Sequence, residues 1–226
     1  MSILSNLELI RRVPLFATLT PKQAEGVAAA VTKQRFKRGE VLVTQGEKSD
    51  RLIILLTGRA RVVTTDSRGR EVILATLGAG DYTGEMSLID NQPHSASVRA
   101  DIQTDTLLLG RAEFARCLGE NSAMAYAVMK GLVQRLRKAD RNIESLALMD
   151  VYGRVARVLI ESATDESPGR KVINGKLSRQ DVAKMVGASR EMVSRVIKDL
   201  EEKGFIEEHA DGVIYINDRR RTPGRI

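Results

Sequence analysis

The sequence predicts a mixed α+β fold with an N-terminal β jelly roll, one long helix and a C-terminal domain of short helices with a β hairpin. Short β-prone runs alternate with glycine-bearing turns from Gln34 to Arg111, which is typical of a two-sheet roll or sandwich. Apolar residues recur every three or four positions from about Asn121 to Leu148, which indicates a long helix. We therefore expect a β domain over residues 1–120, a helix and hinge over 121–150, and a helical domain over 151–226.

The N-terminal domain is expected to begin with a short helix and continue as strands. Thr20 can cap a helix that has Pro21 in its first position and runs to about Ala30. The predicted strands are Val41–Val43, Arg51–Leu56, Ala60–Thr64 and Val72–Leu77. Glycine-bearing turns lie at 38–39, 46–47, 57–58, 67–69 and 78–81. Such spacing favours two antiparallel sheets over a parallel sheet covered by helices.

The long helix carries an apolar stripe that can serve two purposes. Its members are Val128, Leu132, Leu136, Ala139, Ile143 and Leu146. A stripe longer than three heptads favours a parallel two-helix seam, and hence a homodimer. The alternative is that the stripe packs against the helix's own β domain.

A hinge is predicted after the long helix. Gly153 is costly inside a helix, and Asp150 can cap the helix that follows, expected over Arg154–Ala163. Residues 164–169 are then expected to form a surface loop.

Two capped helices with a tight turn between them are predicted near the C-terminus. Ser178 is an N-cap candidate, with Asp181 where the acidic member of a capping box belongs. Gly187 can adopt the left-handed conformation that ends the first helix, and Ser189 can cap the next one at once. This spacing predicts a helix-turn-helix.

The second of these helices separates apolar from charged residues. Val193, Val196, Ile197 and Leu200 form the inward stripe, whereas Arg190, Glu191, Ser194, Arg195 and Lys198 point elsewhere. Arg can bind guanine O6 and N7, and Glu can accept from cytosine N4, which suits a helix in the DNA major groove. Gly204 ends the helix, and a hairpin with Asp211-Gly212 at its turn completes a winged helix-turn-helix. An ordinary solvated helix face is the alternative interpretation.

Residues 178–206 resemble the DNA-binding motif of the bacterial Crp/Fnr transcription-regulator family, and the resemblance covers nearly the whole chain. Ser189, Arg190, Glu191 and Arg195 match the family's Ser-Arg-Glu-x-x-x-Arg pattern. The resemblance implies that these side chains read TGTGA-like half-sites, arranged as an inverted repeat for a dimer. The predicted DNA-binding residues are Arg179, Ser189, Arg190, Glu191, Ser194, Arg195 and Lys198.

The segment Gly80–Ala96 resembles the phosphate-binding cassette of cyclic-nucleotide-binding domains. Such a site needs a glycine for close backbone approach, a carboxylate for the ribose and a cation for the phosphate. Gly84, Glu85 and Ser95 match, but His94 stands where the family has arginine. By the same resemblance, Ala139 and Asp140 of the long helix replace the hydroxyls that contact adenine. The predicted effector-binding residues are Gly84, Glu85, Met86, Ser87, His94, Ser95, Ala139 and Asp140.

These departures leave several effectors open. His94 is a weaker phosphate ligand, part of a pocket reshaped for another effector, or a remnant in a domain that binds nothing. Arginine is always charged and grips two oxygens, whereas histidine is mostly neutral at pH 7. We therefore favour cyclic di-GMP or another nucleotide-type effector over cyclic AMP. An effector-independent regulator with a vestigial sensor domain is the alternative.

Composition argues against the rival classes. The 226 residues carry a net charge of +7, which favours polyanionic partners such as DNA. Neither a membrane-spanning stretch nor a signal core is evident, so a cytoplasmic protein without a membrane partner is expected. Cys117 is the single cysteine, and His94 and His209 are the only histidines, so iron–sulfur, metal and catalytic sites are not expected. This disfavours a metal-dependent jelly-roll enzyme fused to a DNA-binding module.

Two further segments have possible partners. In the resembled family, the loop equivalent to residues 164–169 can touch RNA polymerase, but the residues do not match closely, so the polymerase is only a candidate partner. The basic tail 218–225 is either an arm that contacts phosphates or a solvated end, and the second is favoured.

Overall fold

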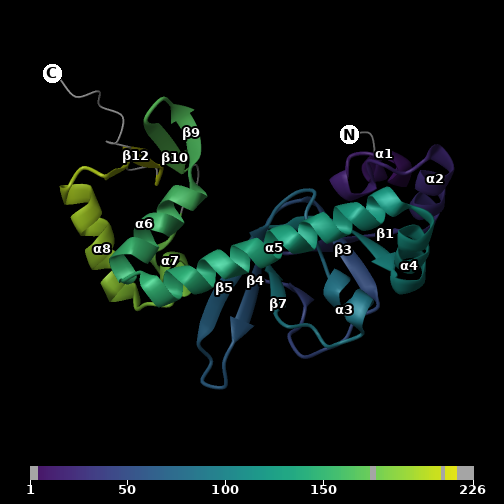
Figure 1. The fold of residues 1–226 in the computed structure, drawn as a ribbon, viewed down its shortest axis with the longest axis horizontal. Helices are drawn as coiled ribbons and strands as arrows, with labels where there is room; N and C mark the ends of the chain where they lie inside the picture. Colours follow the sequence, from purple (N-terminus) through teal and green to yellow (C-terminus); the bar gives the residue numbers. More distant parts are fainter. Residues whose placement is uncertain (1–4, 174–176, 210–211, 218–226) are drawn as a thin grey trace. The chain divides into compact units, whose positions relative to one another are not determined.

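The computed structural model describes residues 5–173, 177–209 and 212–217, and the chain forms two compact units (Figure 1). The units are Met1–Leu136 and Arg137–Ile226, and the boundary falls inside the long helix α5 (Ser122–Leu148). Asp211 of the predicted wing turn and the basic tail lie outside the described residues. Each unit has its own hydrophobic core.

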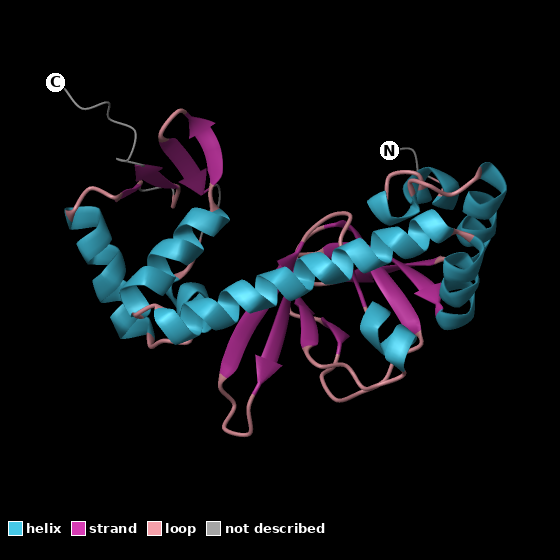
Figure 2. Cartoon of the chain, in the orientation of Figure 1, coloured by secondary structure: helices cyan, strands magenta, loops and turns pink. Residues whose placement is uncertain are grey.

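The first unit contains two four-stranded antiparallel sheets (Figure 2), which agrees with the predicted jelly roll. One sheet has the order β1-β8-β3-β6 and the other the order β2-β7-β4-β5. The strands are β1 (Thr32–Phe36), β2 (Val41–Val43), β3 (Arg51–Thr57), β4 (Ala60–Thr65), β5 (Glu71–Leu77), β6 (Tyr82–Thr83), β7 (Ser97–Ala100) and β8 (Thr104–Gly110). The strands predicted from the sequence are confirmed to within a residue or two at their ends.

Strands β3 and β8 are buried on both faces. Because successive side chains alternate between faces, Ile53 and Leu55 point to the core between the sheets, whereas Leu52 and Ile54 point to the helices. In β8, Leu108 faces the other sheet, while Leu107 and Leu109 face the helices. This two-sided burial explains why these strands are continuous apolar runs rather than alternating ones.

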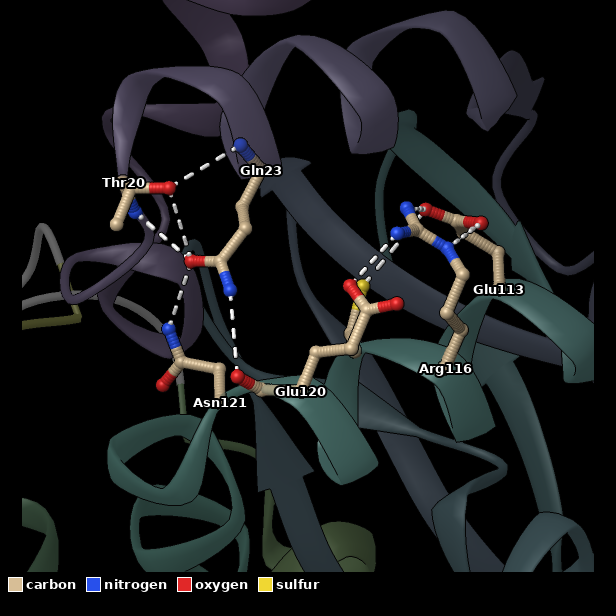
Figure 3. Close-up of polar contacts among 7 residues, drawn as sticks. Thr20, Gln23, Glu113, Arg116, Glu120 and Asn121 are labelled. Atoms are coloured by element: carbon tan, nitrogen blue, oxygen red, sulfur yellow. Dashed lines mark hydrogen bonds and ion pairs between the residues drawn. The ribbon is translucent and has the colours of Figure 1, made fainter.

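The helices of the first unit share one core with this sheet. They are α1 (Asn6–Ile10), the 3-10 turn η1 (Pro14–Phe16), α2 (Pro21–Ala30), α3 (Glu85–Asp90) and α4 (Arg111–Glu120). The cap predicted at Thr20 is confirmed, since its hydroxyl accepts from the N–H of Gln23 at 3.3 Å. Figure 3 shows how Gln23 then donates to the carbonyl of Glu120 and accepts from Asn121, which joins α2 to the α4–α5 junction.

The first half of α5 packs against its own β domain. Met124 and Val128 are buried there, and Leu132 packs against the same core. The prediction that Val128 lies in an intermolecular seam was therefore wrong, and the alternative interpretation holds for that part of the stripe. The exposed apolar row on α5 combines Leu136, Ile143 and Leu146 of the predicted stripe with three residues outside it: Tyr126, Met129 and Val133. The periodicity correctly predicts an apolar face on this helix. It does not separate the buried row from the exposed one, because the two rows overlap in the sequence.

The second unit packs three helices on a four-stranded sheet of order β11-β12-β10-β9. Its elements after α5 are α6 (Val151–Ser162), β9 (Thr164–Ser167), β10 (Arg170–Ile173), α7 (Arg179–Val186), α8 (Arg190–Glu202), β11 (Ile206–Glu208) and β12 (Ile214–Asn217). The antiparallel pairing of β11 with β12 confirms the predicted hairpin.

Two local predictions in this unit were wrong. Residues 164–169 are not simply a loop, because β9 pairs with β10. All side chains of β9 are exposed, so its sequence shows no apolar alternation. Its extended conformation is recognised only from its pairing with β10. Helix α6 begins at Val151, and Gly153 lies in its first turn, although Asp150 does cap it by accepting from the Gly153 N–H at 2.8 Å. Among the described residues, no helix is both long and apolar enough to cross a membrane.

Candidate functional site

The helix-turn-helix is formed by hydrogen bonds local to the chain. Ser178 Oγ accepts from the N–H of Asp181 at 3.0 Å and begins α7. Gly187 ends it with φ +65°, in the left-handed region that glycine adopts without strain. Ser189 Oγ then accepts from the N–H of Met192 at 3.2 Å and begins α8. Both predicted caps and the glycine turn are confirmed.

Helix α8 separates its apolar and polar residues as predicted. Val193, Val196, Ile197 and Leu200 are buried in the core of the second unit. The residues Arg190, Glu191, Ser194, Arg195 and Lys198 are all exposed. This leaves a polar face with both hydrogen-bond donors and acceptors, which begins in the first turn of the helix.

The acceptor on this face is held in its ionised form. The pKa of Glu191 is lowered chiefly by the hydrogen bond from its own backbone N–H, and further by Ser189. Nearby Arg190 and Arg195 act in the same direction. Glu191 can therefore accept a hydrogen bond from a base amino group.

Arg179 has a different environment from the α8 residues. It is the first residue of α7 and only partly exposed, and its guanidinium forms an ion pair with Glu208 of β11. Nη1 lies 3.4 Å from Oε1, and Nη2 contacts Oε2. This pairing could not be predicted from the sequence, because the partners are 29 residues apart.

The cassette turn between β6 and α3 requires glycine. Gly84 has φ +93°, and a Cβ there would lie 2.6 Å from the carbonyl oxygen of Arg51. Gly84 is the N-cap residue of α3, so Glu85 begins this helix at a site where it is only 1% exposed. The glycine is therefore needed for close packing against β3, whereas the predicted approach of its backbone to a phosphate stays a prediction.

The buried carboxylate of Glu85 is bound by the long helix. Arg135 Nη1 donates to Glu85 Oε1 at 2.5 Å, and Arg135 Nη2 donates to the carbonyl of Tyr82 at 2.5 Å. Burial raises the pKa of Glu85, and the positive charge of Arg135 opposes that rise. Sequence reasoning missed Arg135, although it lies one turn before Ala139 on the same helix.

Three buried polar atoms beside this pair have no hydrogen-bond partner among the described residues: Glu85 Oε2, Ser87 Oγ and Tyr82 Oη. Buried polar atoms are normally hydrogen-bonded, so such a group is a candidate binding site for a polar ligand. Helix α5 approaches closely here, since a Cβ on Gly131 would lie 2.4 Å from Tyr82 Oη. The three atoms are one carboxylate oxygen, which accepts, and two hydroxyls, which both donate and accept hydrogen bonds.

His94 is engaged with the loop that precedes β3. Its Nε2 lies 2.8 Å from Ser49 Oγ, and its backbone N–H donates to the carbonyl of Glu47 at 2.8 Å. Partial burial lowers the pKa of His94, and Glu47 opposes this. The neutral imidazole is therefore favoured at neutral pH, and a neutral imidazole is a weak partner for phosphate.

The remaining predicted effector residues are not all part of this cluster. Ser95 and Met86 are exposed, whereas Ser87 is buried. Ala139 and Asp140 are exposed on α5 in the part that belongs to the second unit. Arg111, which sequence reasoning missed, donates to the carbonyls of Ser87 and Leu88 and so holds the end of α3.

The described part of the chain shows no metal-binding cluster of three or more His, Cys, Asp or Glu residues. The thiol of Cys117 is buried, and this burial is the main cause that raises its pKa to about 11. A thiol in this state is a poor nucleophile.

The Glu85–Arg135 pair generates a prediction for stability against pH. When a carboxyl group has a higher pKa in the folded than in the unfolded chain, the free energy of unfolding of the protein falls as pH rises through the folded pKa. Arg135→Met removes the compensating charge, so the pKa of Glu85 should rise further. We expect a loss of about 1–3 kcal/mol at about pH 8, reduced because Arg135 is 41% exposed, and a smaller loss at about pH 5.

Urea denaturation at both pH values measures this difference. The double variant Glu85→Gln/Arg135→Met is the control, since it has no buried charge and should lose the pH dependence. An Arg135→Met loss that is the same at both pH values would contradict the assignment.

The chain matches known proteins over both units. Residues 33–121 match the cyclic nucleotide-binding domain family, and residues 153–221 match the Crp-like helix-turn-helix domain family. The cAMP-activated global transcriptional regulator Vfr of Pseudomonas aeruginosa is 32% identical over 84% of this chain and 92% of its own length. The CRP-like cAMP-activated global transcriptional regulator of Mycobacterium tuberculosis is 29% identical over 96% of this chain and 98% of its own.

A solved structure shares the same fold. The c-di-GMP responsive regulator CLP of Xanthomonas campestris superposes with a TM-score of 0.73, at 22% identity, over 88% of this chain and 99% of that one. With both family matches and a relative of this similarity over nearly its full length, the chain belongs to the Crp/Fnr family of DNA-binding transcription regulators.

Proposed function

We propose that this regulator acts as a homodimer that reads an inverted-repeat operator through α8 and responds to a nucleotide-type effector in its cassette. The observation that carries the proposal is the exposed polar face of α8 on a helix whose opposite face is fully buried. A helix anchored in this way is rigid, so its first turns can be inserted into a major groove as a unit.

The base readout follows from the side chains on that face. Arg190 and Arg195 each offer a planar fork that matches O6 and N7 of guanine, and ionised Glu191 can accept from cytosine N4. This set suits TGTGA-like half-sites. Ser189, Ser194 and Lys198 are proposed to contact the phosphate backbone, which positions the helix but carries no sequence information.

The dimer is proposed to form along α5. Leu136 is 62% exposed, Ile143 65% and Leu146 59%, which is unusual for large apolar side chains on one helix. From Tyr126 to Ile143 this row advances by alternating steps of three and four residues, with Asp140 as its one polar member. This is the spacing of a two-helix seam.

The effector is proposed to differ from cyclic AMP, although the relatives above are named for it. His94 is neutral and engaged with Ser49, so it does not offer the permanent charge that a cyclic phosphate requires. A methyl at Ala139 cannot hydrogen-bond adenine, and the carboxylate of Asp140 is an acceptor suited to the N–H groups of guanine. Cyclic di-GMP is the leading named candidate. The second candidate is a vestigial sensor, which is favoured by the contact of His94 with Ser49 and by the ion pair of Glu85 Oε1 with Arg135.

Arg190→Ala should weaken binding to a duplex with inverted TGTGA half-sites by about 1–3 kcal/mol and relax discrimination at one base pair. Lys198→Ala should weaken operator and scrambled duplexes alike and flatten the salt dependence, because a phosphate contact is independent of sequence. Fluorescence anisotropy titrations on both duplexes measure the two effects. Equal losses on both duplexes for Arg190→Ala would refute its role in base readout.

Leu136→Asp should dissociate the dimer, because it replaces two apolar contacts by two carboxylates, one helical turn from the two that Asp140 already brings to the seam. Sedimentation velocity measures the dissociation, and operator affinity should fall with it. Leu74→Asp is the matched control, since Leu74 is also a half-exposed leucine but lies on β5. If the Leu136→Asp protein sediments as an unchanged dimer, the interface lies elsewhere.

His94→Arg should raise the affinity for cyclic AMP by at most about 1.5–3 kcal/mol, the value of a charge-assisted hydrogen bond. Isothermal titration calorimetry compares it with the wild type and with His94→Gln, which adds no charge. The wild type is expected to bind cyclic AMP weakly or not at all and to bind cyclic di-GMP better. Tight cyclic AMP binding by the wild type that also strengthens operator binding would contradict the proposal, and binding of neither nucleotide would favour the vestigial sensor.

A further inference from the structure

Strand β11 of the wing carries two adjacent carboxylates that face opposite ways. Because side chains alternate along a strand, Glu208 lies on the same face as buried Ile206, toward the helices, and contacts Arg179. Glu207 lies on the other face, where its carboxylate is 3.6 Å from Arg170 and 3.2 Å from His209. The two neighbouring carboxylates therefore engage different partners: Glu208 contacts Arg179, whereas Glu207 contacts Arg170 and the imidazole of His209.

The ion pair of Glu208 with Arg179 is less exposed to solvent than the contacts of Glu207 with Arg170 and His209. Each terminal nitrogen of the Arg179 guanidinium faces one oxygen of the Glu208 carboxylate, and the side chains are only 27% and 31% exposed. Partial burial reduces the screening of such a pair by water and salt. The fork of an arginine binds carboxylate and phosphate with the same donors, so it cannot give both ligands its full set of bonds at once.

We infer that Glu208 is an internal competitor for Arg179, and that it weakens the phosphate contact of this residue and with it the overall affinity for DNA. The inference rests on the proposed function and extends it: Arg179, a predicted DNA-binding residue at the start of α7, is taken to contact the phosphate backbone beside the reading helix. The carboxylate acts in two ways: it occupies the guanidinium, and it places a negative charge close to the phosphates. Both effects are independent of base sequence.

A weakened phosphate contact has a use in a sequence-specific regulator. Phosphate contacts supply most of the non-specific binding, which holds the protein on the many competing sites of a genome. By lowering this term, Glu208 weakens binding to operator and non-operator DNA alike and shortens the time spent on the competing sites, while the ratio of the two affinities is left to α8. The wing then sets the strength of binding, while α8 sets its specificity.

Glu208→Gln tests this competition, because it removes the charge and keeps the shape of the side chain. Its matched control is Glu207→Gln, which changes the net charge equally on the same strand but does not contact Arg179. The probes are a duplex with inverted TGTGA half-sites and a scrambled duplex of the same composition, titrated with full-length protein over a range of salt concentrations. Thermal unfolding of each variant checks that the wing remains folded.

We expect Glu208→Gln to bind both duplexes roughly two- to fivefold more tightly than the wild type, and more so than Glu207→Gln. The slope of log K against log salt should steepen by about 0.9 for each added phosphate contact, and so by about 1.8 for a dimer that gains one contact in each protomer. In an Arg179→Ala background, the gain from Glu208→Gln should fall to that of Glu207→Gln, because no guanidinium remains to be released.

Three results would overturn the inference. Equal gains for Glu208→Gln and Glu207→Gln would mean that only net charge matters. Weaker binding by Glu208→Gln would mean that the ion pair holds the wing in its DNA-binding position. A gain that persists without Arg179 would assign the effect to another cation. Failure of the proposed function is distinguishable, since the wild type would then bind both duplexes equally whatever the variants do.

Discussion

The burial of β3 and β8 on both faces is the constraint on which the first unit depends. Leu52, Ile54, Leu107 and Leu109 form one core with the helices, while Ile53, Leu55 and Leu108 form another with the second sheet. A strand buried on both sides cannot shift register without moving apolar side chains between two cores. It therefore fixes the end of β3, against whose carbonyl at Arg51 the cassette glycine is packed.

The cassette is in turn joined to the long helix by one buried charge. Glu85 is ionisable and almost fully buried, and its charge is balanced by Arg135 of α5. Removing either partner alone would leave the other poorly compensated. Because α5 also carries the exposed apolar row, a ligand that engages Glu85 acts on the residue that binds the proposed dimer helix. In the proposed function, the Glu85–Arg135 pair would connect effector binding to the placement of α5.

The second unit depends more on local chemistry. Ser178 and Ser189 each accept a hydrogen bond from the backbone N–H three residues later, and Gly187 ends α7. The turn between α7 and α8 therefore forms from short-range bonds. The sheet beneath is assembled from segments far apart in the chain, with β9 and β10 preceding α7 and β11 and β12 following α8. The wing is thus attached to the helices through both the sheet and the Glu208–Arg179 pair.

The sequence by itself determined the features that arise from short-range bonds and from alternation: the caps, the glycine turns, most strands, the length of α5 and the apolar face of α8. Only the tertiary structure decided which apolar row of α5 is buried, that residues 164–167 form a strand, and that Arg135, Arg111 and Glu208 contact site residues. These contacts join residues 23 to 50 positions apart, and a charged side chain at such a distance leaves no periodic trace in the sequence. The meeting of Glu85 and Arg135 is created by the packing of α5 on the sheet, because packing, unlike capping, depends on surfaces that exist only once the chain has folded.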